Sequence, residues 1–328
     1  MSELAKKSFM PKSLLKNLIN KIRGSNNAAL SSEIERLILL QGTLHAKLNN
    51  QKNEIKSLAG VEWRVFSQWG EDGIIDWLVE RLPDIPDTFI EFGVGNYRES
   101  NTRMLLQLRN WRGLVLDGSQ ENIDSIKNQN IFWRHTLIAK RAFIDRDNIN
   151  ELIVHSGFNG DIGLLSIDID GNDYWVWEAI SVVSPVVVVC EYNAVFGDLY
   201  KLTVPYGKDF QRTMAHFSNL YFGASLPALI DLAQHKGYVF VGTNSNGCNA
   251  FFIRNDRAHG LLKSISEIRS FPSSIRESRD TLGQLTFLHG DERIRMIRHL
   301  PVVDLETNTT KLLADFGDLY SAKWRGAN

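Results

Sequence analysis

The sequence predicts an α/β protein whose mostly parallel sheet ends in an antiparallel hairpin. From residue 61 onward, short apolar segments alternate with amphipathic segments of helical period, as in parallel strands joined by crossover helices. One apolar segment, Val186–Cys190, reads VVVVC and is typical of a central strand buried on both faces. The last two strand-like segments are separated by only a short Asn/Gly turn, which indicates a hairpin.

The order of the expected elements follows from this alternation. The predicted strands are Thr88–Phe92, Leu114–Leu116, Ala142–Ile144, Leu164–Ile169, Val186–Cys190, Tyr238–Gly242 and Ala250–Ile253, with a turn at Asn244–Gly247. The predicted helices are Asn101–Leu108, Glu121–Lys127, Asn148–Val154, Asp173–Ile180 and Leu226–His235. Residues 61–255 therefore form the expected catalytic domain, and residues 256–328 are expected to be a helical extension packed on it.

Residues 1–60 differ in composition from the rest of the chain. They hold ten Lys or Arg against four Asp or Glu, whereas the whole chain has a net charge of -1. Apolar and Gln side chains recur at intervals of three and four residues in turn, which predicts a coiled-coil seam and a homodimer. A lone amphipathic helix folded onto the main domain is the alternative. The seam positions are Ile34, Leu37, Gln41, Leu44, Leu48, Gln51, Ile55 and Leu58.

Ahead of the seam, apolar residues between Leu14 and Ile22 share one helical face among lysines, and such a face suits an anionic membrane surface. A poorly ordered basic leader is the favoured alternative. We find no signal peptide and no apolar run long enough for a bilayer, and the chain has two cysteines, so a cytoplasmic protein is expected. The near-neutral net charge argues against a nucleic-acid partner.

The first predicted strand ends in a glycine turn where a ligand could approach the backbone closely. Glu91 lies in the strand, and Gly93 and Gly95 follow it. Arg98 stands where a dinucleotide fingerprint would need a third glycine, which argues against NAD. A tight strand–helix turn without a ligand is the alternative.

Two further carboxylates follow the second and third predicted strands. Asp117 comes twenty-two residues after Gly95, where an acid can accept both hydroxyls of a ribose. Asp145 could receive an adenine amino group. Both residues could instead cap the helices that follow them. The glycine turn and Asp117 together predict a cofactor that contains a nucleoside.

The fourth predicted strand ends in SIDIDGND, the densest group of acids in the chain. Alternation places Asp168 and Asp170 on one face, and Glu191 ends the fifth strand at the same sheet edge. These carboxylates could hold a hard divalent ion or supply a general base. Asp173 is expected to be a helix N-terminal charge.

Five segments together resemble the FkbM-like, SAM-dependent methyltransferases of class I. They are SQWGEDGI (67–74), FIEFGVGN (89–96), GLVLDGS (113–119), SIDIDGNDYWVW (166–177) and VVVCEYN (187–193). The resemblance covers roughly residues 61–255. It implies a Rossmann-like fold with a seven-stranded, mostly parallel sheet, and methyl transfer to a sugar hydroxyl in surface-glycan or related glycoconjugate biosynthesis.

The resemblance also implies roles for individual residues. SAM would be held by Glu91, Gly93, Gly95 and Asp117, with Gln68 near its methionine end. A related group of sugar O-methyltransferases binds Mg²⁺ at strand ends that Asp168 and Glu191 occupy here. Tyr192 replaces a neighbouring acid of that group. Asp170 and Asp173 are shorter than the Glu that is more usual at these positions in the FkbM-like family.

Residues 194–222 form a long aromatic connection, which predicts a lid or substrate wall, or else a small separate core. His216 within it and His155 are further candidates for taking a proton from a small-molecule or glycan acceptor. The acid-x-acid pattern of Asp168 and Asp170 also fits a metal-dependent glycosyltransferase that uses a nucleotide sugar. A coiled-coil scaffold with a degenerate methyltransferase fold is the non-enzymatic alternative.

Overall fold

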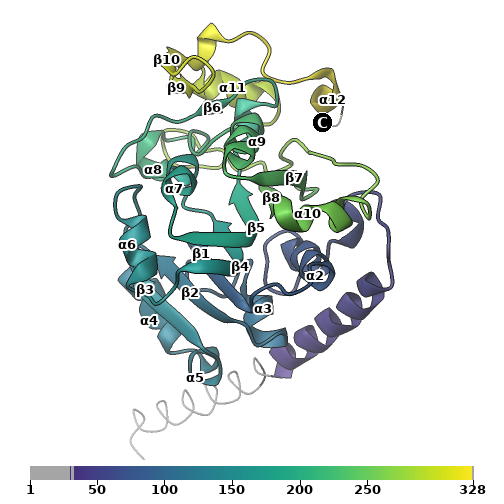
Figure 1. Cartoon of the computed structure of the whole chain (residues 1–328). Coiled ribbons are helices and arrows are strands. Elements are labelled where there is room, and N and C mark those ends of the chain that lie inside the picture. The colour runs from purple at the N-terminus through teal and green to yellow at the C-terminus, as the bar shows by residue number, and fades with distance from the viewer. Residues whose placement is uncertain (1–29, 31–32, 327–328) are drawn as a thin grey trace, which may run out of the picture. The chain divides into compact units, whose positions relative to one another are not determined.

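The computed structural model describes residue 30 and residues 33–326 (Figure 1). The predicted basic leader, including Leu14 to Ile22, lies outside the described residues. The chain divides into two compact units, Met1–Leu44 and His45–Asn328. Within the described residues, no helix has the length and apolar character needed to cross a bilayer.

The predicted coiled-coil seam is shorter in the structure than in the sequence pattern. Residues 33–50 are helical, and the helix ends there. Ile55 instead forms a β-bridge with Ile265, and Leu58 begins the 3-10 helix η1 (Leu58–Val61). Ile55 and Leu58 are both buried in the larger unit, so their apolar character reflects its core. Ile34, Leu37, Leu44 and Leu48 are exposed on the helix, and dimerisation through them stays a prediction.

The central sheet confirms the predicted Rossmann-like architecture. Its seven strands have the order β3-β2-β1-β4-β5-β8-β7, in which the first five are parallel and β8 is antiparallel to both neighbours. The interior strand β5 contains VVVVC and is buried along most of its length, as predicted. The strands are β1 (Thr88–Phe92), β2 (Arg112–Asp117), β3 (Leu137–Arg141), β4 (Gly160–Ile167), β5 (Val183–Glu191), β7 (Tyr238–Thr243) and β8 (Asn249–Arg254).

The third strand lies five residues before its predicted position. The predicted strand Ala142–Ile144 is wrong, because the strand is LIAKR, Leu137–Arg141. In the edge strand β3, burial alternates from Leu137 to Lys140, and the strand ends in two basic residues, Lys140 and Arg141. The apolar segment Ala142–Ile144 follows the strand and lines the cavity described below.

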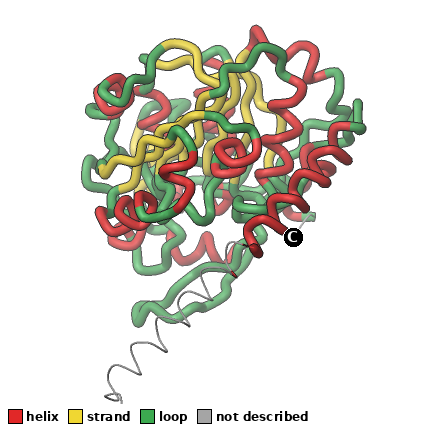
Figure 2. The backbone as a smooth tube through the Cα atoms, turned by 90° about the horizontal axis from the view of Figure 1, so that it is seen from below, coloured by secondary structure: helices red, strands yellow, loops and turns green. Residues whose placement is uncertain are grey.

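Helices pack on the sheet through apolar faces. Figure 2 shows helices and loops around the strands. One buried cluster joins α6, α7 and α9 to the sheet, with Trp177 at its centre beside Phe252. The helices of the sheet region are α2 (Glu71–Arg81), α3 (Arg103–Leu108), α4 (Gln120–Lys127), α5 (Asn130–Arg134), α6 (Ile149–Val154), α7 (Asp173–Ala179), α9 (Leu226–His235) and α10 (Asn255–Leu262).

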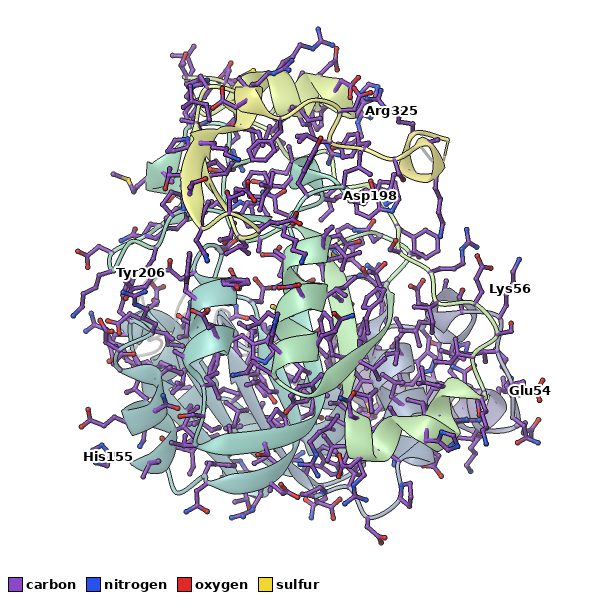
Figure 3. The ribbon with its side chains drawn as sticks, turned by 45° about the horizontal axis from the view of Figure 1, so that its top comes forward. Glu54, Lys56, His155, Asp198, Tyr206 and Arg325 are labelled. Atoms are coloured by element: carbon purple, nitrogen blue, oxygen red, sulfur yellow. The ribbon has the colours of Figure 1, made fainter. Side chains whose placement is uncertain are left out.

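The C-terminal region contains strands as well as the predicted helices. A three-stranded antiparallel sheet joins β10 and β9 to β6, which comes from the aromatic connection 194–222. Asp198 of this connection accepts hydrogen bonds from the backbone and hydroxyl of Ser321, and Figure 3 labels Asp198 beneath the C-terminal strands. The elements are η2 (Ala194–Phe196), β6 (Leu202–Thr203), α8 (Arg212–Ala215), α11 (Asp291–Ile297), β9 (Pro301–Asp304), β10 (Thr309–Leu312), η3 (Leu313–Asp315) and α12 (Ala322–Arg325).

Candidate functional site

The largest of the leading cavities opens at the carboxyl ends of β1, β2 and β4. β1 lies between β2 and β4, so the chain crosses to opposite sides of it, and ligands of open α/β sheets bind at such a switch point. This large cavity has a volume of about 640 Å³. Its lining includes Gly93, Gly95, Asp117, Phe143, Ile144, Asp168, Asp170, Phe210, Arg212, Asn219, Glu277 and Arg279.

The two glycines after β1 serve different purposes. Both have positive φ, +72° at Gly93 and +53° at Gly95, which L side chains adopt at a cost. A Cβ on Gly93 would lie 1.6 Å from the carbonyl oxygen of Asp168, so only glycine lets β1 and β4 approach here. A Cβ on Gly95 would meet nothing within 4 Å, because that position faces open space at the cavity.

The side chain of Glu91 stabilises the segment that leads into α3. It is only 4% exposed, and its carboxylate accepts hydrogen bonds from Ser100 Oγ at 2.8 Å, from the Asn101 amide at 2.8 Å and from Thr102 Oγ1 at 2.5 Å. Burial raises the pKa of Glu91 above its usual value. These bonds fix the segment that leads into α3, so a direct contact with SAM would have to share oxygens that already have partners.

Asp117 and Asp145 differ in their access to the large cavity. Asp117 lines it and accepts hydrogen bonds from the Gly95 amide and the Asn122 side chain. Asp145 is not among the lining residues. One of its oxygens accepts from the amides of Asp147 and Asn148 in the turn before α6, whose N-cap is Asn148, and the other lies 3.8 Å from Lys208 Nζ.

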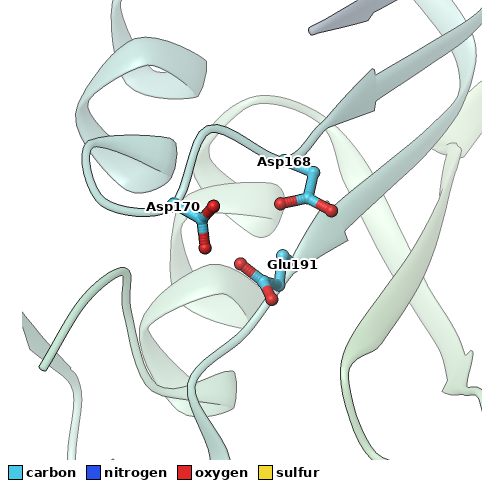
Figure 4. Close-up of side chains that lie close together, drawn as sticks. All are labelled: Asp168, Asp170 and Glu191. Carbon is cyan, nitrogen blue, oxygen red and sulfur yellow. The ribbon is translucent and has the colours of Figure 1, made fainter. Parts of the chain in front are cut away.

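Three carboxylates converge at the ends of β4 and β5, as predicted. Oxygens of Asp168, Asp170 and Glu191 all lie within 4.8 Å of one another, and Figure 4 shows the three side chains turned toward a common point. Burial, together with the neighbouring acids, raises the pKa of Asp168 and of Glu191 well above the usual carboxyl values. Asp173, the first residue of α7, makes different contacts. Its oxygens accept from the amides of Ile169 and Gly171 in the loop before α7, and burial raises its pKa to about 6.

Arg212, which the sequence analysis did not single out, lies against the acid cluster. Its guanidinium is 2.7 Å from Asp170 Oδ1, donates to the Asn219 carbonyl at 2.7 Å and lies 3.9 Å from the ring centroid of Phe222. Its charge opposes the rise in pKa of both Asp168 and Glu191. The sequence offered no signal for this role, because Arg212 is one arginine in a long connection and reaches the cluster only through the fold.

Two smaller cavities meet at the same cluster. One, of about 490 Å³, is lined by Glu91, Asn249 and all three cluster acids. The other, of about 120 Å³, extends from Glu191 toward Phe222. Gln68 and Arg212 line both smaller cavities. The structure thus brings Gln68 to the edge of the site, as the resemblance implied.

The two acids after Gln68 organise the surrounding loops. Asp72 accepts hydrogen bonds from the backbone amides of Val65, Phe66 and Ser67 through one oxygen. Glu71 is fully buried and accepts from the side chains of Asn244 and Asn249 at 2.7 and 2.8 Å. The SQWGED segment therefore connects the first part of the domain to the β7–β8 hairpin.

The candidate histidines are not brought to the cluster. His216 contacts Ser218 Oγ at 2.7 Å and packs near His299, and burial lowers its pKa. His155 is an exposed residue after α6, 3.6 Å from Glu151. Neither lines any of the three cavities described above.

Residues of the aromatic connection 194–222 line the large cavity and also form part of a separate apolar core. Phe196 and Tyr221 belong to a separate buried cluster under the C-terminal sheet, which was the predicted alternative to a lid. Phe210 instead lines the large cavity and packs so closely on Gly171 that a Cβ there would lie 2.2 Å from the ring. Tyr206, labelled in Figure 3, lies under the guanidinium of Arg146 at 4.0 Å.

The sequence matches no family model and no curated protein sequence. Among solved structures, the N-terminal domain of EvdMO1 with SAH bound is 12% identical, with a TM-score of 0.38, and the match covers 58% of this chain and 82% of that one. A SAM-dependent methyltransferase from Clostridium acetobutylicum is 14% identical, with a TM-score of 0.35, over 56% and 90% of the two chains. A precorrin-6y C5,15-methyltransferase from Geobacter metallireducens is 14% identical, with a TM-score of 0.31, over 51% and 71%.

Proposed function

We propose that this chain is a SAM-dependent O-methyltransferase. The observation that carries the proposal is the large cavity at the switch point of the sheet, where the Gly93–Gly95 turn and Asp117 lie side by side. Open space at Gly95 and an acid at the neighbouring strand end fit a nucleoside whose ribose lies between them. The residues present therefore fit the cofactor that the sequence resemblance implied.

Residues around the large cavity would hold the parts of SAM in a consistent order. Asp117 would accept the ribose hydroxyls, and the apolar side chains of Phe143 and Ile144 would pack against the adenine. Gln68 would lie toward the methionine end, beside the acid cluster. Glu91 would act on the cofactor indirectly, through the segment 100–102 that it anchors.

The acid cluster suits the transfer of a methyl group to a hydroxyl oxygen. Bound SAM supplies a methyl group on a sulfonium, which an oxygen nucleophile attacks in line. The chain then has to align the hydroxyl and remove its proton. Asp168 and Asp170 are the two candidates for that base, because both follow the end of β4 and line the large cavity.

A sugar is the acceptor that the surroundings favour. The wall opposite the sheet combines the aromatic ring of Phe210 with polar side chains of Asn219, Glu277 and Arg279. Aromatic faces pack on the apolar faces of sugar rings, and the polar groups can bond the hydroxyls. We propose a glycan or glycoconjugate precursor as the substrate class.

Calorimetric titration of the purified chain with SAM and with SAH tests the cofactor. We expect micromolar binding to the wild type and at least tenfold weaker binding to Asp117→Ala. Asp124→Ala is the matched control, because Asp124 is an acid of the following helix α4 whose side chain, among the described residues, accepts a hydrogen bond from Gln120 alone. Absence of binding to either ligand would refute the proposal. Nucleotide sugars with Mg²⁺ would then test the glycosyltransferase alternative that the acid cluster also fits.

A further inference from the structure

A buried arginine lines the smallest of the three cavities. Arg293 on α11 is 3% exposed, and its guanidinium donates hydrogen bonds to the backbone carbonyls of Ser273 and Ile275, at 3.1 and 3.0 Å. Its Nε is buried without a hydrogen-bond partner, and no carboxylate of a described residue lies within 4.0 Å of its nitrogens. A guanidinium stays charged, and a buried charge is costly unless an opposite charge compensates it.

The acids nearest to Arg293 in the sequence have other partners. Asp291 lies 3.6 Å from Arg325, and Glu292 lies 3.7 Å from His289. Both acids are exposed to solvent, whereas Arg293 on the same helix is buried. The arginine therefore carries its charge into the interior without an acid from its own helix.

The same cavity, of about 120 Å³, contains a second donor that lacks a partner. Trp69 lines the cavity together with Arg293, and the Nε1 of Trp69 is also buried without a hydrogen-bond partner. An indole nitrogen can only donate, as can a guanidinium. Two donors that need an acceptor, one of them on a cation, indicate a ligand with anionic oxygens. The volume is well above the roughly 15 Å³ that one water needs, so a group of several atoms fits.

Two carboxylates also line this cavity, and each already has a cation that acts on it. Glu277 lies 3.2 Å from Arg279 and 3.9 Å from Arg212. The charge of Arg212 also acts on Glu191, and burial raises the pKa of Glu191 well above its usual value, which favours the neutral form. The charge that the lining leaves for a ligand is therefore the positive charge of Arg293.

We propose that this cavity binds an anionic oxygen group of the methyl acceptor, a carboxylate or a phosphate, at Arg293 and Trp69. The planar guanidinium with its fixed N–H donors suits both groups. Because the cavity begins at Glu191, a sugar anchored there by its anion would extend toward the acid cluster, where its hydroxyl would lose a proton. The acceptor is then an acidic or phosphorylated sugar. Its identity as the acceptor rests on the proposed function, whereas the anion site itself does not.

Calorimetric titration of the full chain with D-glucuronate, D-glucose 6-phosphate and D-glucose, in a phosphate-free buffer, tests the site without any activity assay. D-Glucuronate differs from D-glucose only by a carboxylate in place of one hydroxymethyl group. We expect at least one of the two anions to bind at least tenfold more tightly than D-glucose, and the tighter anion distinguishes a carboxylate from a phosphate.

Variants at the two donors should weaken binding of the anion selectively. We expect a loss of at least tenfold in Arg293→Gln and at least threefold in Trp69→Phe. Arg295→Gln is the matched control for the arginine, because Arg295 is exposed on the same helix. Trp63→Phe is the control for the indole, because Trp63 Nε1 is also buried without a partner but Trp63 does not line the cavity.

Thermal unfolding and SAH titration of the same variants separate a lost ligand from a lost fold. If Arg293→Gln does not fold, Trp69→Phe still decides, because phenylalanine keeps an aromatic ring and removes the donor. Equal affinity for D-glucose and both anions, or unchanged anion affinity in both donor variants, overturns the inference even where SAH binds. Anion binding by a chain that does not bind SAH would support the site and refute the proposed function instead.

Discussion

The backbone amide of Gly95 donates a hydrogen bond to Asp117 Oδ2 at 2.8 Å, which joins the ends of the first two strands directly. The other oxygen of Asp117 accepts from Ser119 and Asn122. The carboxylate is therefore oriented before any ligand arrives, with its position tied to the turn that the ligand would approach. Such preorganisation lowers the entropy that binding would otherwise cost.

The two glycines of this turn should respond differently to alanine. Gly95→Ala places a methyl group in open space with a strained φ, so we expect a stability loss of about 1 kcal/mol but at least tenfold weaker SAM binding. Gly93→Ala forces a Cβ onto the Asp168 carbonyl, which should cost at least about 3 kcal/mol and disturb the fold itself. Denaturant unfolding and SAH titration of both variants check this contrast. Equal loss of stability in both would contradict the geometry.

The positions of the candidate site residues at strand ends could be predicted because parallel strands deliver their carboxyl ends to one edge. Asp117, Asp168 and Glu191 were placed at that edge in this way, and all three line its cavities. Roles that depend on contacts between distant segments left no local pattern. The pairing of Arg212 with Asp170 spans 42 residues, and the bond from Asn249 to Glu71 spans 178.

Errors in the sequence prediction have a related cause. The apolar segment Ala142–Ile144 was taken for a strand because burial at a cavity wall and burial in a sheet produce the same residue types. The spacing of Ile55 and Leu58 happens to fit the heptad pattern, but both side chains belong to the core of the larger unit. Apolar periodicity reports that a side chain is covered, and it does not identify what covers it.

Arg212 should hold the connection 194–222 against the sheet. The Arg212 side chain is only 18% exposed and bonds the Asn219 carbonyl as well as Asp170, whose own side chain is 56% exposed. Arg212→Gln should speed amide hydrogen exchange in residues 205–222 at least tenfold. Arg212→Lys should restore only part of the protection, because an ammonium group lacks the several fixed N–H donors of a guanidinium group. Arg254→Gln is the control, with a side chain of similar exposure that pairs at Asp161. Equal exchange in wild type and Arg212→Gln would show that other contacts hold the connection.

Acid should weaken the C-terminal sheet through Asp304. The hydrogen bond from Lys311, at 2.7 Å, holds the pKa of Asp304 below its usual value, with a further contribution from Thr307. A depressed pKa in the folded state adds stability above the unfolded pKa, and this stability is lost as the pH falls through the folded pKa. Urea unfolding from about pH 6 to about pH 2 should show a smaller acid loss in Asp304→Asn and in Lys311→Met than in the wild type. A parallel decline in all three proteins would exclude this ion pair as the cause.

The helix of residues 33–50 should mediate dimerisation through its exposed seam. Leu37 and Leu44 are 65% and 55% exposed, and large apolar side chains repeated along one helical face are stabilised when a second helix covers them. We expect light scattering to give twice the mass of one chain for the wild type and a single mass for the double variant Leu37→Glu, Leu44→Glu. Leu40→Glu is the control, because Leu40 is 59% exposed on the same helix but outside the seam.

The fold of residues 45–328 has its own core, so the double variant should keep its melting temperature and its SAH affinity. A monomeric wild type would favour the alternative in which the helix is not a dimer contact, and loss of SAH binding in the double variant would show that the helix supports the site instead.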